Sequence, residues 1–219
     1  MLDKNGKSCH GGDSQWALPT KNDDGTWTPG EWMPAIEGNL IPCENGYHLC
    51  REQDLVEWLH DAIYKVEYDG ELIEDNNKVI TRRVRLVAGT AWNDKSARLF
   101  ACDCAEHMLH IYETKYPNDD RPRKAIETSR KYAHGKATEE EWNAASDAAW
   151  DAASDAAWAA AWDAASAAAS AAASAAAWAA ASAAARVAAS DAARAAASDA
   201  ARAAEEEWQT EKLMEYLKG

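Results

Sequence analysis

Apolar and polar residues alternate with a period of two along residues 64–73 (YKVEYDGELI) and again along residues 78–87 (KVITRRVRLV). This alternation is typical of half-buried β-strands, and the polar residues 75–77 between the two segments predict a β-hairpin. Residues 39–50 (NLIPCENGYHLC) predict two shorter extended pieces joined by a turn at Asn45-Gly46. The first part of the chain is therefore expected to contain an antiparallel sheet.

Helical spacing of apolar residues occurs once inside this part and dominates the chain after residue 93. Residues 51–63 (REQDLVEWLHDAI) predict one amphipathic helix packed on the sheet. Residues 95–116 predict a longer helix with Asp94 as its N-cap. The residues that form its apolar stripe are Ala97, Phe100, Ala101, Cys104, Met108 and Ile111.

Two further helices are predicted from their end signals. Residues 123–133 (RKAIETSRKYA) form one helix, which His134-Gly135 ends. Thr138, followed three residues later by Glu141, is a capping box and begins the next helix.

An alanine-rich repeat follows, in which sixteen consecutive positions at a spacing of four, from Trp142 to Arg202, are Trp, Ser or Arg. Alanine has the highest helix propensity, so this segment is predicted to be helical. Four residues rotate by ~400°, and the large side chains therefore advance by ~40° around the helix with each repeat. Such a row suits short helices that cross one another. We favour these over a single rod of ~120 Å, although a rod that associates with a partner or with itself is also compatible with the pattern.

These patterns predict an α+β class with two domains. Residues 1–92 form a small α+β module with a Trp-rich N-terminal loop, and residues 93–219 form an all-α region that includes the alanine-rich tetrad repeat at 142–204.

The amino-acid composition bears on which partners the chain can bind and on where in the cell it is expected. The 219 residues carry a net charge of −14, which argues against a DNA or RNA partner because phosphate polymers would be repelled. No apolar run reaches the ~20 residues of a membrane span, so no membrane association is expected. The first residues contain no apolar stretch of a secretory signal, and a cytoplasmic location is the expectation. Five cysteines then indicate free thiols or a metal site rather than disulfides.

Tryptophans and arginines are the candidate ligand-binding residues. The first part of the repeat holds tryptophans that could line an aromatic wall, and its last part holds arginines that could bind anions. Two arginines on one strand face and one in the first turn of a helix could also hold a phosphate. The residues in this hypothesis are Trp150, Trp158, Trp162, Trp178, Arg186, Arg194, Arg83, Arg85 and Arg123. The alternative is that the tryptophans fill an alanine-lined core and the arginines are solvated or paired with carboxylates.

Cys43, His48 and Cys50 are the candidate metal ligands, because thiolates and imidazoles are the groups that zinc prefers. Buried structural thiols are the alternative interpretation, and no other cofactor is expected. No phosphate-binding loop, nucleophile elbow or paired-histidine zinc helix is present, and no catalytic residue is assigned.

Several stretches resemble proteins of phages and their bacterial hosts in which a small Cys-x-x-Gly-x-His-x-Cys module precedes a helical region. That helical region is similar to immunity proteins with Ala/Trp/Arg-rich repeats. The residues that carry the resemblance are Cys43, Gly46, His48, Cys50, Arg98, Cys104, Glu106, Pro122, Arg123, Ala125 and Ile126.

The resemblance implies a non-enzymatic immunity or counter-defence protein, phage-related and active in the host cell. It would act by stoichiometric capture of a host or phage protein or of a small nucleotide-like signal molecule. One alternative is a nucleotide-processing enzyme in the N-terminal module, either zinc-assisted or similar to ADP-ribosyltransferases at residues 46–58. The other alternative is a helical scaffold that forms homo-oligomers.

Overall fold

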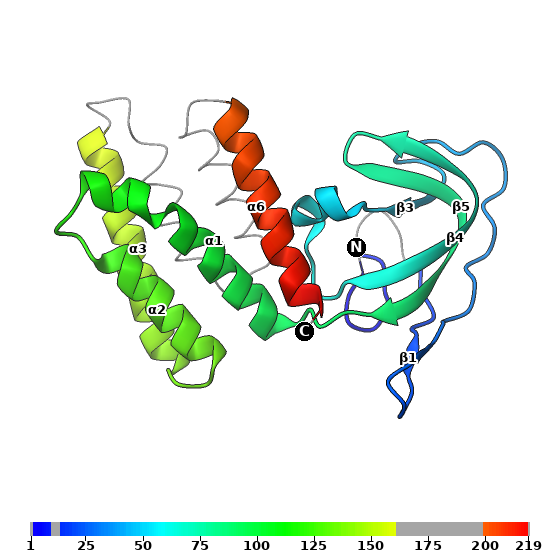
Figure 1. The fold of residues 1–219 in the computed structure, drawn as a ribbon, viewed down its shortest axis with the longest axis horizontal. Helices are drawn as coiled ribbons and strands as arrows, with labels where there is room; N and C mark the ends of the chain where they lie inside the picture. Colours follow the sequence, from blue (N-terminus) through cyan, green and yellow to red (C-terminus); the bar gives the residue numbers. More distant parts are fainter. Residues whose placement is uncertain (1, 10–13, 161–198, 219) are drawn as a thin grey trace. The chain divides into compact units, whose positions relative to one another are not determined.

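The computed structural model describes residues 2–9, 14–160 and 199–218, and it places side chains at 2–9, 14–152 and 203–218. Strands fill the first part of the chain and helices the second (Figure 1), which confirms the α+β class with a sheet module followed by a helical region. The described chain divides into two compact units, Met1–Trp92 with Leu217–Gly219, and Asn93–Tyr216. Within the described residues, no helix is long and apolar enough to cross a membrane.

The described residues of the first unit form two antiparallel sheets. Strands β1 and β2 form a two-stranded sheet, and β3, β4 and β5 form a three-stranded sheet in the order β3-β5-β4. The bounds are β1 (Thr20–Lys21), β2 (Trp27–Thr28), β3 (Tyr47–Leu49), β4 (Tyr64–Asp75) and β5 (Lys78–Gly89). The long β4–β5 hairpin turns at residues 76–77, as its alternating pattern predicts.

The N-terminal loop completes the sheet along β5. Three of its backbone amides, those of Gly30, Met33 and Ile36, donate to carbonyls of β5 at 2.9 Å. On one sheet face, Val84 and Leu86 are 0 % and 1 % exposed beneath Trp16 and Met33. The Trp-rich loop therefore packs on the sheet and supplies its core.

The helix predicted over residues 51–63 is wrong in length and type. The structure has a 3-10 helix, η1 (Glu52–Trp58), and the chain is already extended at Leu59, with φ −61° and ψ 135°. The Trp58 indole N–H donates to the carbonyl of Asn77 at 2.9 Å. This hydrogen bond holds Trp58 against the hairpin turn. The residues after Trp58 then run towards β4, and the helix does not continue despite its amphipathic pattern.

Four helices with described residues form the second unit: α1 (Asp94–Lys115), α2 (Arg121–Ala133), α3 (Glu139–Ala160) and α6 (Asp199–Lys218). Helix α1 is capped by Asn93 rather than by the predicted Asp94, because the Asn93 side chain accepts from the amides of Lys95 and Ser96. Whether the alanine-rich repeat forms one helix or several short ones depends on residues outside the described part of the chain.

The remaining end signals are confirmed. Gly135, with φ 66°, directly follows α2 and its C-cap residue. Thr138 and Glu141 form the predicted capping box: each side chain accepts a hydrogen bond from the other residue's backbone amide, at 3.1 and 2.8 Å.

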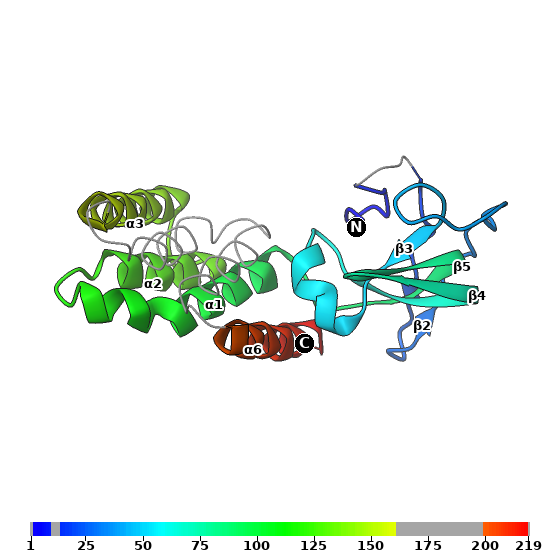
Figure 2. The same cartoon turned by 90° about the horizontal axis from the view of Figure 1, so that it is seen from above.

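Helix α1 is buried on two sides (Figure 2). One side packs with α2 and α3 through Cys102, Ala105, Leu109, Ala125, Ile126 and Ala149. The other side meets α6, where Phe100 and Tyr216 pack edge to face with ring centroids 6.1 Å apart. The predicted stripe therefore describes only part of the buried surface of this helix.

One carboxylate of α1 joins both neighbours. Asp103 pairs with Arg130 of α2 at 2.6 Å and accepts a hydrogen bond from the Tyr216 hydroxyl of α6 at 2.7 Å. Lys212 of α6 lies 3.7 Å from the same carboxylate. Asp103 is thus the polar link between α2 and α6.

Candidate functional site

The cysteine and histidine residues of the first unit do not gather around one point. The Cys43 backbone N–H donates to His48 Nε2 at 2.9 Å, which occupies the lone pair that a metal ion would need. The Cys50 thiol instead donates to the carbonyl of Arg51 at 3.2 Å, and burial raises the pKa of this thiol to about 12. Within the described part of the chain, no group of three or more His, Cys, Asp or Glu side chains could hold a metal ion.

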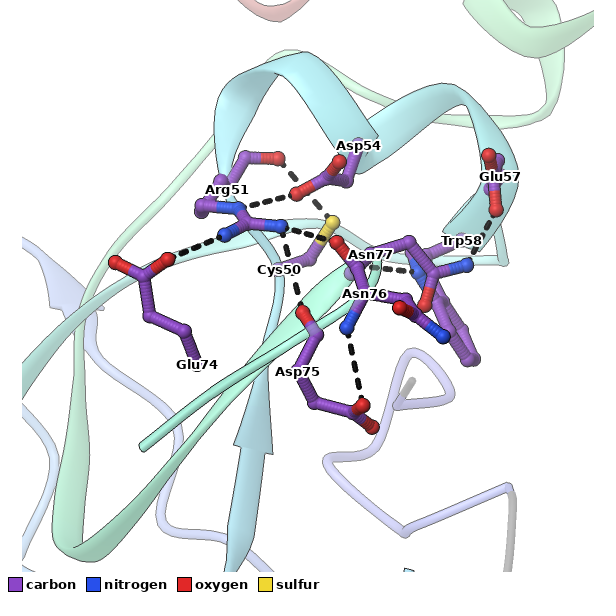
Figure 3. A network of polar contacts seen from close by, with 9 residues as sticks. All are labelled: Cys50, Arg51, Asp54, Glu57, Trp58, Glu74, Asp75, Asn76 and Asn77. Atoms are coloured by element: carbon purple, nitrogen blue, oxygen red, sulfur yellow. Dashed lines mark hydrogen bonds and ion pairs between the residues drawn. The ribbon is translucent and has the colours of Figure 1, made fainter. Parts of the chain in front are cut away.

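Arg51 is the centre of a polar network beside Cys50 (Figure 3). Its guanidinium donates to Asp54 of η1 at 2.5 Å, to Glu74 of β4 at 3.2 Å and to the carbonyl of Asn76 at 2.6 Å. These contacts fasten the tip of the β4–β5 hairpin to η1. The guanidinium thus has partners on η1, on β4 and at the hairpin turn, which indicates a structural role.

Arg83 and Arg85 share one face of β5, as predicted, but both are paired with carboxylates of β4. Arg85 lies 2.6 Å from Glu67, and Arg83 lies 3.7 Å from Asp69. Both guanidinium groups also lie over the Trp32 ring, 4.7 and 5.0 Å from its centroid. Arginines with partners on both sides are poorly placed to bind a phosphate as well.

Arg123 is engaged in the same way in the second unit. Its Nε and Nη2 donate to the two carboxylate oxygens of Glu113, each at 2.7 Å. These hydrogen bonds hold the pKa of Glu113 below its ordinary value. Arg123 thus joins α2 to α1, whereas Arg83 and Arg85 belong to the other unit.

Most of the predicted repeat residues lie outside the part that the structure describes with side chains. Trp162, Trp178, Arg186 and Arg194 are not among the described residues. Trp158 belongs to α3, but its side chain is likewise not described. Of the nine predicted ligand-binding residues, Trp150 is the one tryptophan whose side chain can be assessed.

Trp150 of α3 is 51 % exposed, the largest exposed fraction among the large hydrophobic residues of the described chain. Asp151 follows it directly, and Asp147 and Asn143 precede it by three and seven residues, so all lie on one side of the helix. All three neighbours are exposed. We call these four residues the Trp150 face.

Trp142, the first tryptophan of the repeat, is packed instead. Its ring stacks on Tyr132 of α2 with centroids 5.5 Å apart, and its indole N–H donates to the buried Ser129 hydroxyl at 3.1 Å. The Arg98 guanidinium of α1 lies 4.7 Å from the centroid of the Tyr132 ring. Of the two repeat tryptophans whose side chains are described, Trp142 therefore joins helices and Trp150 faces outward.

The Arg98 stack was not predicted as a site from the sequence. Its three members are 34 and 10 residues apart in the chain, and only the packing of three helices brings Arg98, Tyr132 and Trp142 together. A cation held against aromatic rings stabilises such a junction.

A buried polar group also lies between α1 and α6. Glu205 is 6 % exposed, and its carboxylate accepts from Gln209 at 2.8 Å and contacts His107 Nδ1 at 2.8 Å. The His107 ring stacks on Trp208 with centroids 3.9 Å apart. The contacts of His107 with Glu205 and Trp208 join α1 to α6.

Together the features define an α+β protein whose second unit is a helical bundle with internally paired charges and an outward-facing tryptophan. The chain belongs to the family described as "Imm-5 like putative immunity protein", whose model matches residues 93–216. No curated protein and no solved structure matches the chain. The matched residues coincide with the helical unit, and the family gives the chain an immunity-type role.

Proposed function

We propose that this chain is a non-enzymatic immunity protein that neutralises a toxic protein by stoichiometric binding, and that the Trp150 face contacts the partner. The observation that carries the proposal is the exposure of Trp150 on the helical unit that matches the family. An exposed indole costs free energy in water, and tryptophan is among the residues that contribute most to protein interfaces. Burial of the Trp150 indole against a partner would therefore stabilise the complex.

Charge supports a basic partner. The Trp150 face carries the exposed carboxylates of Asp147 and Asp151, and the whole chain has a net charge of −14. An acidic surface attracts a basic partner and raises its association rate, mostly at low salt. Enzymes that cleave nucleic acids need basic surfaces, so a toxin of this kind has the complementary charge.

The proposal is tested by co-expression of the chain with basic toxic proteins of its source genome and by light scattering of the purified mixture. A 1:1 complex and restored growth are the expected results, and the measured masses also report any homo-oligomer. Trp150→Ala is expected to weaken binding by about thirtyfold, which corresponds to about 2 kcal/mol for a central interface residue.

Tyr68→Ala is the matched control, because Tyr68 is an aromatic residue of similar exposure, 47 %, in the other unit. We expect this variant to bind as the unmodified chain does. Equal weakening by both substitutions, or no weakening by Trp150→Ala, would refute the Trp150 face as the contact surface.

Capture of a nucleotide-like signal molecule is the second candidate, favoured by the close placement of Arg98, Tyr132 and Trp142. A base could stack on such rings while the guanidinium holds a phosphate. Calorimetry against cyclic and ADP-ribose-derived nucleotides separates the two proposals. Micromolar binding that Arg98→Met abolishes and Trp150→Ala leaves intact would favour the nucleotide.

A further inference from the structure

Strand β4 forms one edge of the three-stranded sheet. Its inner side pairs with β5, and among the described residues no other strand or loop makes a backbone hydrogen bond with it. Residues 65–72 of this strand are all exposed. In an antiparallel sheet, every second residue of an edge strand directs its backbone N–H and C=O away from the sheet, where these groups can pair with a further strand.

The regular part of this edge is short. The register with β5 shifts between Lys65 and Val66 and again between Asp69 and Leu72, so residues 66–69 form an evenly paired stretch. We call residues 66–69 the β4 edge. Irregularities of this kind twist an edge strand and limit long, repetitive pairing. The β4 edge therefore suits a short extended segment.

One face of the β4 edge is apolar. Val66, which is 37 % exposed, lies opposite the buried Leu86 of β5. Tyr68, which is 47 % exposed, lies opposite the buried Val84. Residues that lie opposite each other in a sheet share a face, so Val66 and Tyr68 extend the core face of the sheet to its edge. Apolar side chains on an added strand would cover them.

The other face of the β4 edge carries carboxylates on the outer side of ion pairs. Glu67 lies 2.6 Å from Arg85, and Asp69 lies 3.7 Å from Arg83. The two carboxylate side chains are 49 % and 65 % exposed, whereas those of the two arginines are 30 % and 42 % exposed. A carboxylate can accept from more than one donor. Cations on an added strand would therefore continue the alternation of charge across the sheet.

We propose that the β4 edge is a docking site for an extended segment of a partner protein in which apolar and basic residues alternate. The segment adds one strand to the sheet, and its backbone hydrogen bonds supply the affinity. Its apolar side chains cover Val66 and Tyr68, and its basic side chains pair with Glu67 and Asp69. This site goes beyond the proposed immunity function, which rests on the Trp150 face of the other unit.

A second copy of this chain fits the β4 edge less well than a basic segment does. An antiparallel pair of two β4 strands centred on Tyr68 places each Glu67 opposite an Asp69. Like charges directly opposite one another destabilise a sheet. The net charge of −14 also repels a second copy.

Calorimetry of the full chain with synthetic seven-residue peptides tests the docking site. Valine and lysine alternate in the first peptide, valine and glutamate in the second, and glycine and lysine in the third. The first peptide should bind about tenfold more tightly than either of the others, because it alone forms both kinds of cross-strand pair. Equal binding of the glycine–lysine peptide would mean that charge alone attracts the peptides, and it would overturn the proposal.

Methylation of the peptide backbone shows whether a strand is added to the sheet. The amides of the valines are methylated in one version of the first peptide, and those of the lysines in another. Since alternate amides of an added strand face β4, one version should lose binding and the other should keep it. The same result for both versions would contradict strand addition.

Substitutions on β4 locate the site. Tyr68→Ala should weaken binding of the valine–lysine peptide about fivefold, and Glu67→Gln about threefold. Ile41→Ala and Glu44→Gln are the matched controls and should not change the affinity, because both residues are exposed in the turn before β3. Circular dichroism checks that each variant is folded. Unchanged affinity in folded Tyr68→Ala and Glu67→Gln would rule out the β4 edge.

The docking site and the proposed immunity function fail independently. Trp150→Ala should leave binding of the peptide unchanged, and Tyr68→Ala should leave binding of the toxic protein unchanged. Light scattering of the chain alone tests for self-association. A dimer that Tyr68→Ala dissociates would show that a second copy occupies the β4 edge, against the proposal.

Discussion

Asp119, in the connection between α1 and α2, offers the clearest prediction about stability. Its carboxylate accepts from the Tyr112 hydroxyl at 2.7 Å, from the Arg121 amide at 3.1 Å, and from Nε and Nη2 of the same guanidinium at 2.9 and 2.7 Å. Tyr112 is 1 % exposed in the helical core. Asp119→Asn keeps the shape of the side chain but removes the charge that these donors stabilise.

The magnitude follows from the pKa of Asp119. Hydrogen bonds from Arg121, and then from Tyr112, lower this pKa from 3.8 to about 2, although burial opposes them. Since one pKa unit corresponds to about 1.4 kcal/mol, the charged form contributes about 2 kcal/mol to the free energy of unfolding at neutral pH. The side chain is 20 % exposed, so solvent reduces this contribution only in part.

The sign of the pH effect is set by the direction of the change. A carboxyl group with a lowered pKa in the folded state contributes its full stability above pH 3.8 and loses it as the pH falls through about 2. The Asn variant should therefore be about 1–2 kcal/mol less stable at pH 7 and almost equally stable at pH 2.

Urea unfolding at pH 7, 5, 3 and 2, followed by helical circular dichroism, measures both effects. Asp120→Asn is the matched control, because Asp120 forms an exposed ion pair with Lys124 at 2.9 Å. This variant should lose less than about 0.5 kcal/mol of unfolding free energy. A loss below about 0.3 kcal/mol for Asp119→Asn at pH 7, or a loss that persists unchanged at pH 2, would refute the reasoning.

Two further predictions concern Gly46 and Glu205. A Cβ on Gly46, at φ 148°, would lie 2.2 Å from Ile80 Cγ2, so Gly46→Ala should cost more than about 2 kcal/mol in urea unfolding. Gly25→Ala, at φ 85° in open space, should cost only about 1 kcal/mol, and similar losses for both would contradict the steric argument. Glu205→Ala should lower the free energy of unfolding by about 1–3 kcal/mol, because the buried Gln209 amide loses its acceptor. Glu206→Ala, on an exposed residue of the same helix, is its control and should change little.

Local signals in the sequence predicted local structure well. The β4–β5 hairpin and the capping box of Thr138 and Glu141 depend on residues close in the chain, and both are confirmed. The helix expected at residues 51–63 failed because Trp58 is held by the hairpin turn, 19 residues away. Asn93 rather than Asp94 caps α1. Both residue types are common at helix N-caps, so capping preferences alone do not decide between two neighbouring positions.

The candidate site was less predictable, because the role of each charged residue depends on which opposite charge the fold places beside it. The sequence identified Arg83, Arg85 and Arg123 as basic residues, but their carboxylate partners lie 10 to 18 residues away and are paired only by the fold. The alternating pattern predicts β4 as a strand, but its place at the edge of the sheet follows only from the strand order β3-β5-β4. The prediction for Trp150 as a binding residue stays a prediction, with its exposure as the supporting observation.

The link at Asp103 also sets an order of events during synthesis. Arg130 is made soon after Asp103, whereas Tyr216 is 113 residues further along the chain. At 5–20 residues per second, a ribosome needs on the order of ten seconds to reach it. During that interval α1 and α2 can pair while the side of α1 that carries Phe100 is uncovered. The helical unit therefore completes this side of its core only after α6 has been made.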